Sequence, residues 1–210
     1  DPLEPLVGQV EAELLVDRDN FAQAQEALSE SLSLCPMSAH TLYLLGTMAI
    51  SAFDMPNAEK IATQIEQISS IARSGGMAVS VPHALAAQIR ARAMLRQNDP
   101  DLASSAIAPA QAIFPDRFEL QELDAAIAAV RYDFAGAQAM LDAYDKRAPG
   151  SPRALMIAGK ALAEARQYDQ SAVWLREAGK RAPHWNQPAI ELGLLQMQAG
   201  RDEESQQALE

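Results

Sequence analysis

Apolar positions between Ser151 and Trp185 predict two amphipathic helices joined by a short turn. Ser151 followed by Pro152 is typical of a helix start, because serine caps a first turn and proline has no N–H to lose there. The stripe that one helical face needs follows at Leu155, Ala158, Gly159 and Leu162. A first helix is therefore expected up to about Arg166.

A second helix is predicted from Tyr168 to the breakers Gly179 and Pro183. Its apolar side carries Ala172, Leu175 and Ala178. A pair of such short helices cannot bury either apolar face alone, so it must pack on neighbouring pairs.

The same pattern recurs along the chain. Pro115, Pro149 and Pro183 lie 34 residues apart, and each closes an alanine-rich apolar segment. A small residue stands early in each predicted second helix, at Ala24, Ala58, Ala103, Ala137, Ser171 and Ser205. Four residues later comes Leu28, Ala62, Ile107, Leu141, Leu175 or Leu209. We expect the small residues to let paired helices approach closely and the later residues to fill the gap between them.

These signals predict an all-α protein with a single array of about five and a half to six helix-turn-helix repeats. The repeats span about 5–38, 39–83, 84–117, 118–151, 152–185 and 186–210, the last of them incomplete. The second repeat is the longest, and the breaker Gly75-Gly76 predicts a lengthened second helix and then a long loop between Ile71 and His83. The sequence starts at Asp1 without Met and stops at Glu210 inside a predicted helix, so further repeats or another domain are expected beyond it.

The repeat resembles the tetratricopeptide repeat (TPR) family, a 34-residue helix-turn-helix. In that family the first helix carries large-x2-Leu-Gly-x2-Tyr, the second carries Ala-x3-Phe, and a proline closes the repeat. The fifth repeat matches through Leu155, Ala158, Gly159, Leu162, Ser171, Leu175, Ala178 and Pro183. The third and fourth repeats depart from the pattern at Arg90, Gln121 and Asp124, so their first helices are expected to pack differently. The resemblance implies an α-solenoid in the form of a right-handed superhelix that binds proteins or peptides.

The charge balance argues against two classes of partner. The net charge is −11, and phosphate binding needs clustered lysine and arginine, so nucleic acid and anionic membrane surfaces are not expected. No apolar run approaches the roughly 18 residues that cross a bilayer. Thirteen arginines against four lysines hint at a bacterial genome rich in GC, and the compartment stays open between cytoplasm and periplasm.

No catalytic, cofactor or metal site emerges from the residues. His40, His83 and His184 fall in three different repeats, and none has a histidine four residues away to share a metal. Nucleotide-binding and hydrolase motifs are absent. Cys35 and His40 are five residues apart, but Pro36 breaks the local geometry that a thiolate pair would need. We therefore expect a protein that is not an enzyme and needs no cofactor.

The third repeat forms the most basic region, through Arg73, Arg90, Arg92, Arg96 and Arg117. Two interpretations stay open. These arginines pair with acidic side chains of the next repeat, such as Glu119 and Glu122, or they bind the carboxylate of a peptide through their forked donors.

In a TPR superhelix the first helices line the concave side, and their exposed positions would form the binding groove. Those positions are His40, Tyr43, Thr47, Gln88, Arg92, Arg96, Glu119, Glu122, Arg153, Met156, Lys160, Gln187, Ile190 and Leu194. Basic and acidic bands alternate among them, which favours an extended or helical ligand of mixed charge. Tyr43, Met156 and Ile190 would be its apolar anchors.

Three functional hypotheses follow. The first is a non-catalytic scaffold that binds a peptide or protein segment in the concave groove. The second is the repeat portion of a larger bacterial enzyme or export and assembly protein whose catalytic domain lies outside these residues. The third is a homo-oligomer formed through the open C-terminal end, where Leu192, Leu195 and Leu209 are expected to be exposed.

Overall fold

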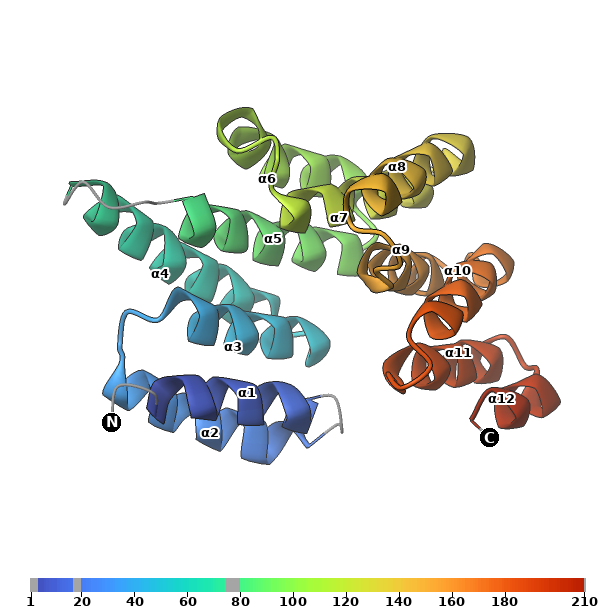
Figure 1. The fold of residues 1–210 in the computed structure, drawn as a ribbon, viewed down its shortest axis with the longest axis horizontal. Coiled ribbons are helices and arrows are strands. Elements are labelled where there is room, and N and C mark those ends of the chain that lie inside the picture. Colours follow the sequence, from blue (N-terminus) through green and yellow to red (C-terminus); the bar gives the residue numbers. More distant parts are fainter. Residues whose placement is uncertain (1–3, 17–19, 75–79, 210) are drawn as a thin grey trace. The chain divides into compact units, whose positions relative to one another are not determined.

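The computed structural model describes residues 4–16, 20–74 and 80–209, and within these ranges it contains twelve helices and no strand (Figure 1). The first helices of the six pairs are α1 (Glu4–Val16), α3 (Ala39–Ser51), α5 (Ser80–Arg96), α7 (Phe118–Val130), α9 (Arg153–Glu164) and α11 (Gln187–Gln198). The second helices are α2 (Phe21–Leu34), α4 (Met55–Ser74), α6 (Pro100–Ile113), α8 (Phe134–Arg147), α10 (Tyr168–Arg181) and α12 (Asp202–Leu209). The predicted all-α fold of repeated helix pairs is confirmed.

The 34-residue period is visible in where the second helices begin. Helices α6, α8, α10 and α12 start at Pro100, Phe134, Tyr168 and Asp202, each 34 residues after the one before. Helices α2 and α4 are separated by the same interval. The interval from the start of α4 to the start of α6 is longer than in the other repeats. Helix α4 has 20 residues and α5 has 17, and these long helices account for most of the difference.

The predicted long loop from Ile71 to His83 is wrong at both ends. Helix α4 continues to Ser74, and α5 begins at Ser80, so most of the extra residues are helical. Pro82 does not prevent this start, because it lies in the first turn, where a missing N–H costs no hydrogen bond. The breaker Gly75-Gly76 lies outside the described residues.

One backbone feature recurs at the turn inside the repeats. The residue two positions before each of five second helices has a positive φ: 61° at Phe53, 58° at Asn98, 65° at Tyr132, 61° at Arg166 and 72° at Gly200. The N–H of the following residue bonds back into the first helix, as Asp54 N does to Ala49 O at 2.8 Å. This is the Schellman ending of a helix, which fixes the direction in which the second helix returns.

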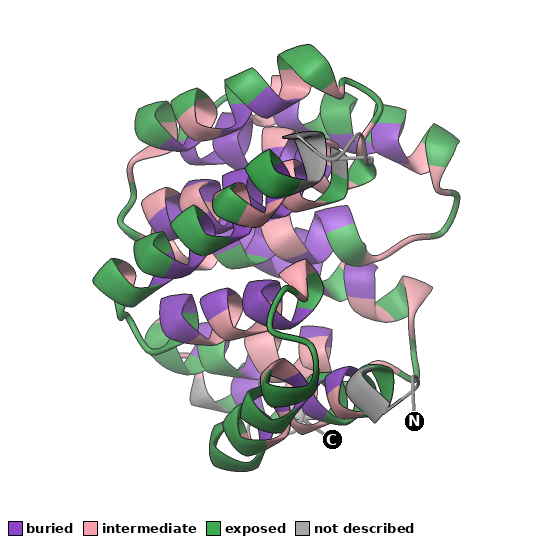
Figure 2. Ribbon diagram, turned by 90° about the vertical axis from the view of Figure 1, so that its left-hand side faces the viewer, coloured by how far each residue is buried: buried purple, intermediate pink, exposed green. Residues whose placement is uncertain are grey.

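Paired helices touch at the predicted small residues. Ala24, Ala58, Ala103, Ala137 and Ser171 are fully buried, and Ser205 is 4% exposed. The two serines also bond the first helix of their own pair: Ser171 Oγ donates to Gly159 O at 2.7 Å, and Ser205 Oγ donates to Gly193 O at 3.0 Å. Figure 2 shows buried positions on the helix faces that meet other helices and exposed positions on the outer faces.

The contacts divide the chain into two compact bodies. The N-terminal body comprises Asp1–Ala93 and Ala106–Pro115, and the C-terminal body comprises Met94–Ser105 and Asp116–Glu210. A core cluster of the N-terminal body contains Ile61, Ile65 and Ile89. Leu123, Leu162 and Leu175 are among the fully buried side chains of the C-terminal body. A single continuous array and its right-handed superhelix remain predictions.

Replacing a glycine inside a helix by alanine usually stabilises a protein, but the tight contact between α9 and α10 predicts the opposite at Gly159. A Cβ added at Gly159 would lie 2.9 Å from Leu175 Cγ, so Gly159→Ala should lower the free energy of unfolding by about 1–3 kcal/mol. At Gly179, inside α10, an added Cβ meets nothing closer than Pro188 at 3.8 Å. Gly179→Ala should therefore stabilise the protein by up to about 1 kcal/mol. Urea denaturation measures both variants, and a stabilising Gly159→Ala would contradict this packing.

The left-handed turn predicts opposite effects at two equivalent positions. Phe53 is 59% exposed and carries the cost of a positive φ, whereas asparagine tolerates that conformation. Phe53→Asn should raise the free energy of unfolding by about 0.5–1 kcal/mol, and Asn98→Phe should lower it by a similar amount. Thermal unfolding of both variants checks this, and shifts of the same sign would show that the conformation is not the cause.

Candidate functional site

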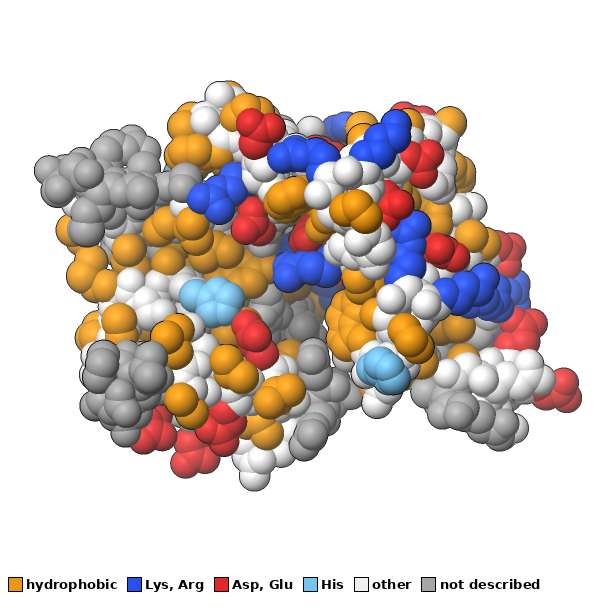
Figure 3. Space-filling view, in the orientation of Figure 1, with side chains coloured by type: hydrophobic (Ala, Val, Ile, Leu, Met, Phe, Trp, Pro, Cys, Tyr) orange, Lys and Arg blue, Asp and Glu red, His pale blue; other side chains and the backbone are white. Residues whose placement is uncertain are grey.

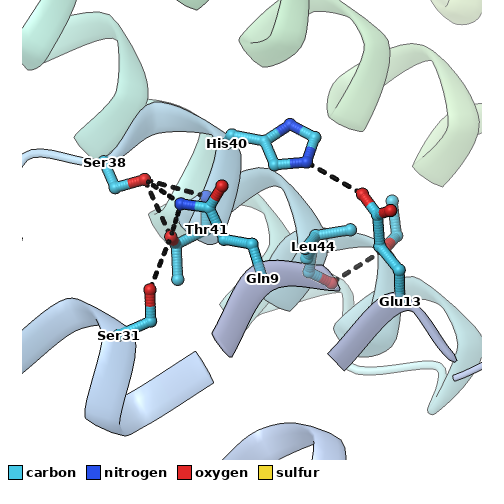
Figure 4. Close-up of polar contacts among 8 residues, drawn as sticks. Gln9, Glu13, Ser31, Ser38, His40, Thr41 and Leu44 are labelled. Atoms are coloured by element: carbon cyan, nitrogen blue, oxygen red, sulfur yellow. Dashed lines mark hydrogen bonds and ion pairs between the residues drawn. The ribbon is translucent and has the colours of Figure 1, made fainter. Parts of the chain in front are cut away.

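The first helices of the N-terminal body carry a continuous row of polar and aromatic contacts. Glu13 on α1 and His40 on α3 point toward each other, with Oε1 and Nε2 2.9 Å apart (Figure 4). The His40 ring stacks on Tyr43 at 6.3 Å between centroids, and the Arg92 guanidinium from α5 lies 5.8 Å from the centre of the Tyr43 ring. Figure 3 shows hydrophobic side chains around α3 and α5, interrupted by a histidine and a neighbouring carboxylate.

A buried hydrogen-bond network holds α1 against α3 beneath this row. Ser38 caps α3 by accepting from Thr41 N at 3.2 Å. Gln9 Nε2 donates to Ser38 Oγ at 3.0 Å and to Thr41 Oγ1 at 2.8 Å (Figure 4). Because Gln9 and Glu13 are one turn apart on α1, this network also fixes how far along α3 the Glu13 side chain lies, and so places it next to His40.

Arg92 differs from the other cations that the structure describes. Lys60, Lys146 and Arg166 also have no ion pair within the described ranges, but they are exposed, whereas Arg92 is partly buried. Its Nε is buried and has no hydrogen-bond acceptor among the described residues. Leaving such a donor unsatisfied costs about 1–3 kcal/mol. The stacking on Tyr43 holds the guanidinium in place but supplies no acceptor.

Four predicted groove residues are buried, although the sequence pattern suggested that they are exposed. Tyr43 is 9% exposed, Gln88 1%, Glu122 2% and Met156 7%. They stand at equivalent positions of their first helices, as Gln9 does, and the contacts of Gln9 give the reason: this position faces the start of the next first helix. Among the other predicted groove residues, His40, Arg153 and Lys160 are exposed, and Thr47 is partly buried.

In the C-terminal body the groove charges pair with one another. Arg153 Nε on α9 lies 3.0 Å from Glu122 Oε1 on α7, and Lys160 Nζ lies 2.6 Å from Glu191 Oε1 on α11. Gln187 Nε2 also donates to Glu191, at 3.1 Å. The alternating charges that the sequence suggested for a ligand therefore meet across adjacent first helices.

Glu122 has a second partner that the sequence did not reveal. Tyr144 on α8 donates its OH to Glu122 Oε1 at 2.8 Å. Burial raises the pKa of Tyr144 to about 12, and the negative charge of Glu122 contributes. The phenol therefore stays protonated at neutral pH and keeps donating to the buried carboxylate.

Arg96 is bound to a carboxylate from the same body. Its Nη1 lies 2.6 Å from Oε1 of Glu164, the last residue of α9. Burial raises the pKa of Glu164, although Arg96 and Lys160 act in the opposite direction.

Arg90 and Arg96 of the third repeat form ion pairs with other carboxylates than the sequence suggested. Arg90 stands where the TPR pattern has leucine, and it reaches back to α4, where it pairs with Glu66 and lies 2.9 Å from Glu59 Oε1. Arg117 is 3.9 Å from Glu119, which is one of the expected acidic partners. Pairing with the preceding repeat gives the Arg90 guanidinium two carboxylates at a position where the TPR pattern has leucine. The side chain of Arg73 lies outside the described set.

The leucines predicted to be exposed at the C-terminal end are not the ones that reach the surface. Leu195 is 1% exposed and Leu192 is partly buried, and the side chain of Leu209 is outside the described set. Other apolar groups of α11 reach the surface instead: Leu194 is 48% exposed and Met197 57%, while Ile190 is partly buried.

Two clefts occupy the same place in the repeat. One, of about 590 Å³, lies between α2 and α4 over α3, and the other, of about 430 Å³, lies between α8 and α10 over α9. Their repetition indicates a gap left by helix stacking, so we assign them no ligand. Among the described residues, no three metal-binding side chains cluster, and none of the helices combines the length and apolarity needed to span a bilayer.

Comparisons with known proteins support the fold. No protein-family model matches the sequence, and no curated protein sequence matches it. The structure is similar to the crystal structure of PilW, a widely conserved type IV pilus biogenesis factor, with a TM-score of 0.52. The match covers 97% of this chain and 90% of the PilW chain at 13% sequence identity. At this identity the likeness establishes a shared helical repeat fold and nothing finer.

Proposed function

We propose that this protein is a non-catalytic scaffold of the TPR type that binds a peptide or protein segment along its first helices. The fold supports this, since helical repeats expose extended surfaces that suit chain-like ligands. The TPR signature of the fifth repeat and the likeness to PilW support the same class. The remaining accessible groove residues, including Glu119, Gln187, Ile190 and Leu194, would contribute shape and contact area.

Arg92 is the observation that carries the proposal. A partly buried guanidinium without an ion pair is costly in the free protein, and an incoming carboxylate that pairs with its accessible edge would offset that cost. Tyr43 supplies an aromatic floor beside it, and His40 and Glu13 offer a donor and an acceptor for the ligand backbone. The ligand that fits is an extended segment with a carboxylate next to an apolar side chain.

The assembly role of PilW favours one version of the second hypothesis. PilW is a pilus biogenesis factor, so this chain would serve as the repeat portion of a bacterial export or assembly protein. A catalytic domain in the same reading frame would instead support the enzyme version.

The proposal predicts a specific energetic coupling between Arg92 and a ligand carboxylate. Peptides would be selected on the purified protein from a random library of acidic and apolar segments, and their affinities measured by fluorescence anisotropy. Arg92→Gln should weaken binding roughly 10–100-fold, and replacing the ligand carboxylate by an amide should weaken it equally. The double change should cost no more than either alone, because both remove one interaction.

Arg176→Gln is the matched control, since it removes the same charge from α10, a second helix. Its affinity for the selected peptides should equal that of the unmodified protein. Peptides that bind Arg92→Gln as tightly as the unmodified protein, but lose affinity for Arg176→Gln, would place the ligand on the second helices and overturn the proposal.

A further inference from the structure

One ion pair of the C-terminal body spans two repeats. Arg96 and Glu164 are 68 residues apart in sequence, whereas ion pairs that join neighbouring first helices, such as Lys160–Glu191, span 31 residues. Arg96 ends α5, and Glu164 ends α9. The contact is therefore not part of the ladder that joins each repeat to its neighbour.

Glu164 occupies an unfavourable position for a carboxylate. Its side chain is 16% exposed, and burial raises its pKa. It stands at the C-terminal end of a helix, where the helix dipole disfavours negative charge. Glu191 adds a like charge from α11, and the two cations that oppose these effects are Arg96 and Lys160.

The direction of the pKa shift of Glu164 shows how its charge affects the stability of the fold. A carboxyl group whose pKa is higher in the folded than in the unfolded state binds more protons when folded, so stability falls as pH rises through that window. At neutral pH the charged Glu164 is thus a net cost, even with Arg96 beside it. Burying two charges often costs more than their attraction returns.

Arg96 itself is well placed to receive a ligand anion. Its side chain is one-third exposed, and its guanidinium already holds one carboxylate in hydrogen-bonding geometry. A carboxylate that arrives from solvent without the unfavourable surroundings of Glu164 would make the same bonds at lower cost.

We propose that Arg96 is a subsite for a carboxylate of a peptide bound along the first helices of the C-terminal body, and that Glu164 fills this subsite as an internal competitor until the ligand displaces it. The displaced Glu164 would share Lys160 with Glu191, which already pairs with that lysine. This inference rests on the proposed peptide-binding function and adds to it an anchoring point in the C-terminal body and a threshold for binding.

The test uses glutarate as the probe and the Nε–H signal of Arg96 in nuclear magnetic resonance as the readout. In Glu164→Gln, glutarate should shift this signal in a saturable way, with a dissociation constant at least about 10-fold lower than in the unmodified protein. Glu177→Gln is the control, because it also removes a carboxylate that pairs with an arginine, Arg181, and it should behave like the unmodified protein. Equal dissociation constants in Glu164→Gln and the unmodified protein, or no response of Arg96 in either, would overturn the inference.

A second measurement needs no substitution. Methanesulfonate stays ionised in mild acid, so its affinity for Arg96 in the unmodified protein should rise as the pH is lowered and Glu164 takes up a proton, since burial raises the pKa of that carboxyl group. Glu191 faces Glu164 from α11, so the same measurement on Glu164→Gln serves as the control, and its pH response should be the smaller one. An affinity that does not change with pH in the unmodified protein would contradict a competing carboxylate.

The two proposals fail in different ways. Arg92→Gln should weaken peptide binding roughly 10–100-fold but leave the glutarate response of Arg96 in Glu164→Gln intact. If peptides never require Arg92 while Arg96 still takes glutarate, the groove proposal fails and the subsite stands. If peptides require Arg92 but Glu164→Gln changes neither peptide nor glutarate affinity, the subsite fails alone.

Discussion

The close contact between the two helices of each pair is the constraint on which the rest of this structure depends. At Gly159, Leu175 lies so near the first helix that a methyl group would collide with it, and Ser171 bonds the carbonyl of the same glycine. A pair held this tightly has little freedom to slide or rotate. Each first helix therefore presents a fixed face, and residues on successive first helices meet in a fixed register.

That register explains why polar groups are tolerated between repeats. Gln9 reaches Ser38 and Thr41, while Glu122 reaches Arg153 and Tyr144. These residues lie at equivalent places in their helices, so one geometry serves both. Buried polar groups need matched partners, which makes the junctions between repeats specific as well as stable. The matching is incomplete, because the side-chain amides of Gln88 and Gln196 and the Nε atoms of Arg92 and Arg96 are buried without a hydrogen-bond partner in the described part of the chain. Arg92 differs from these in being a partly buried cation without an ion pair, and Glu164 is a carboxylate whose charge is disfavoured.

The sequence predicts the repeat because its signal is local. Prolines and small residues recur at 34-residue intervals with apolar stripes between them, and they identify the helix pairs. They also identify the small buried residue early in each second helix, from Ala24 in α2 to Ser205 in α12. The left-handed turn residues escaped prediction, because Phe53, Tyr132 and Arg166 are not glycine and owe their conformation to hydrogen bonds from the preceding helix. The ion-pair partners of the charged residues could not be predicted from the sequence for a different reason. Whether Arg90 reaches forward or back depends on the spacing of helices, which no single repeat encodes.

The proposed function depends on Arg92, which has no ion pair among the described residues and would bind a ligand carboxylate. A crystal structure of the protein with a selected acidic peptide tests this most directly. A peptide carboxylate oxygen is expected within hydrogen-bonding distance of Arg92, with an apolar ligand side chain against Tyr43. A peptide bound along the second helices, with Arg92 unchanged and without an acceptor, would contradict it.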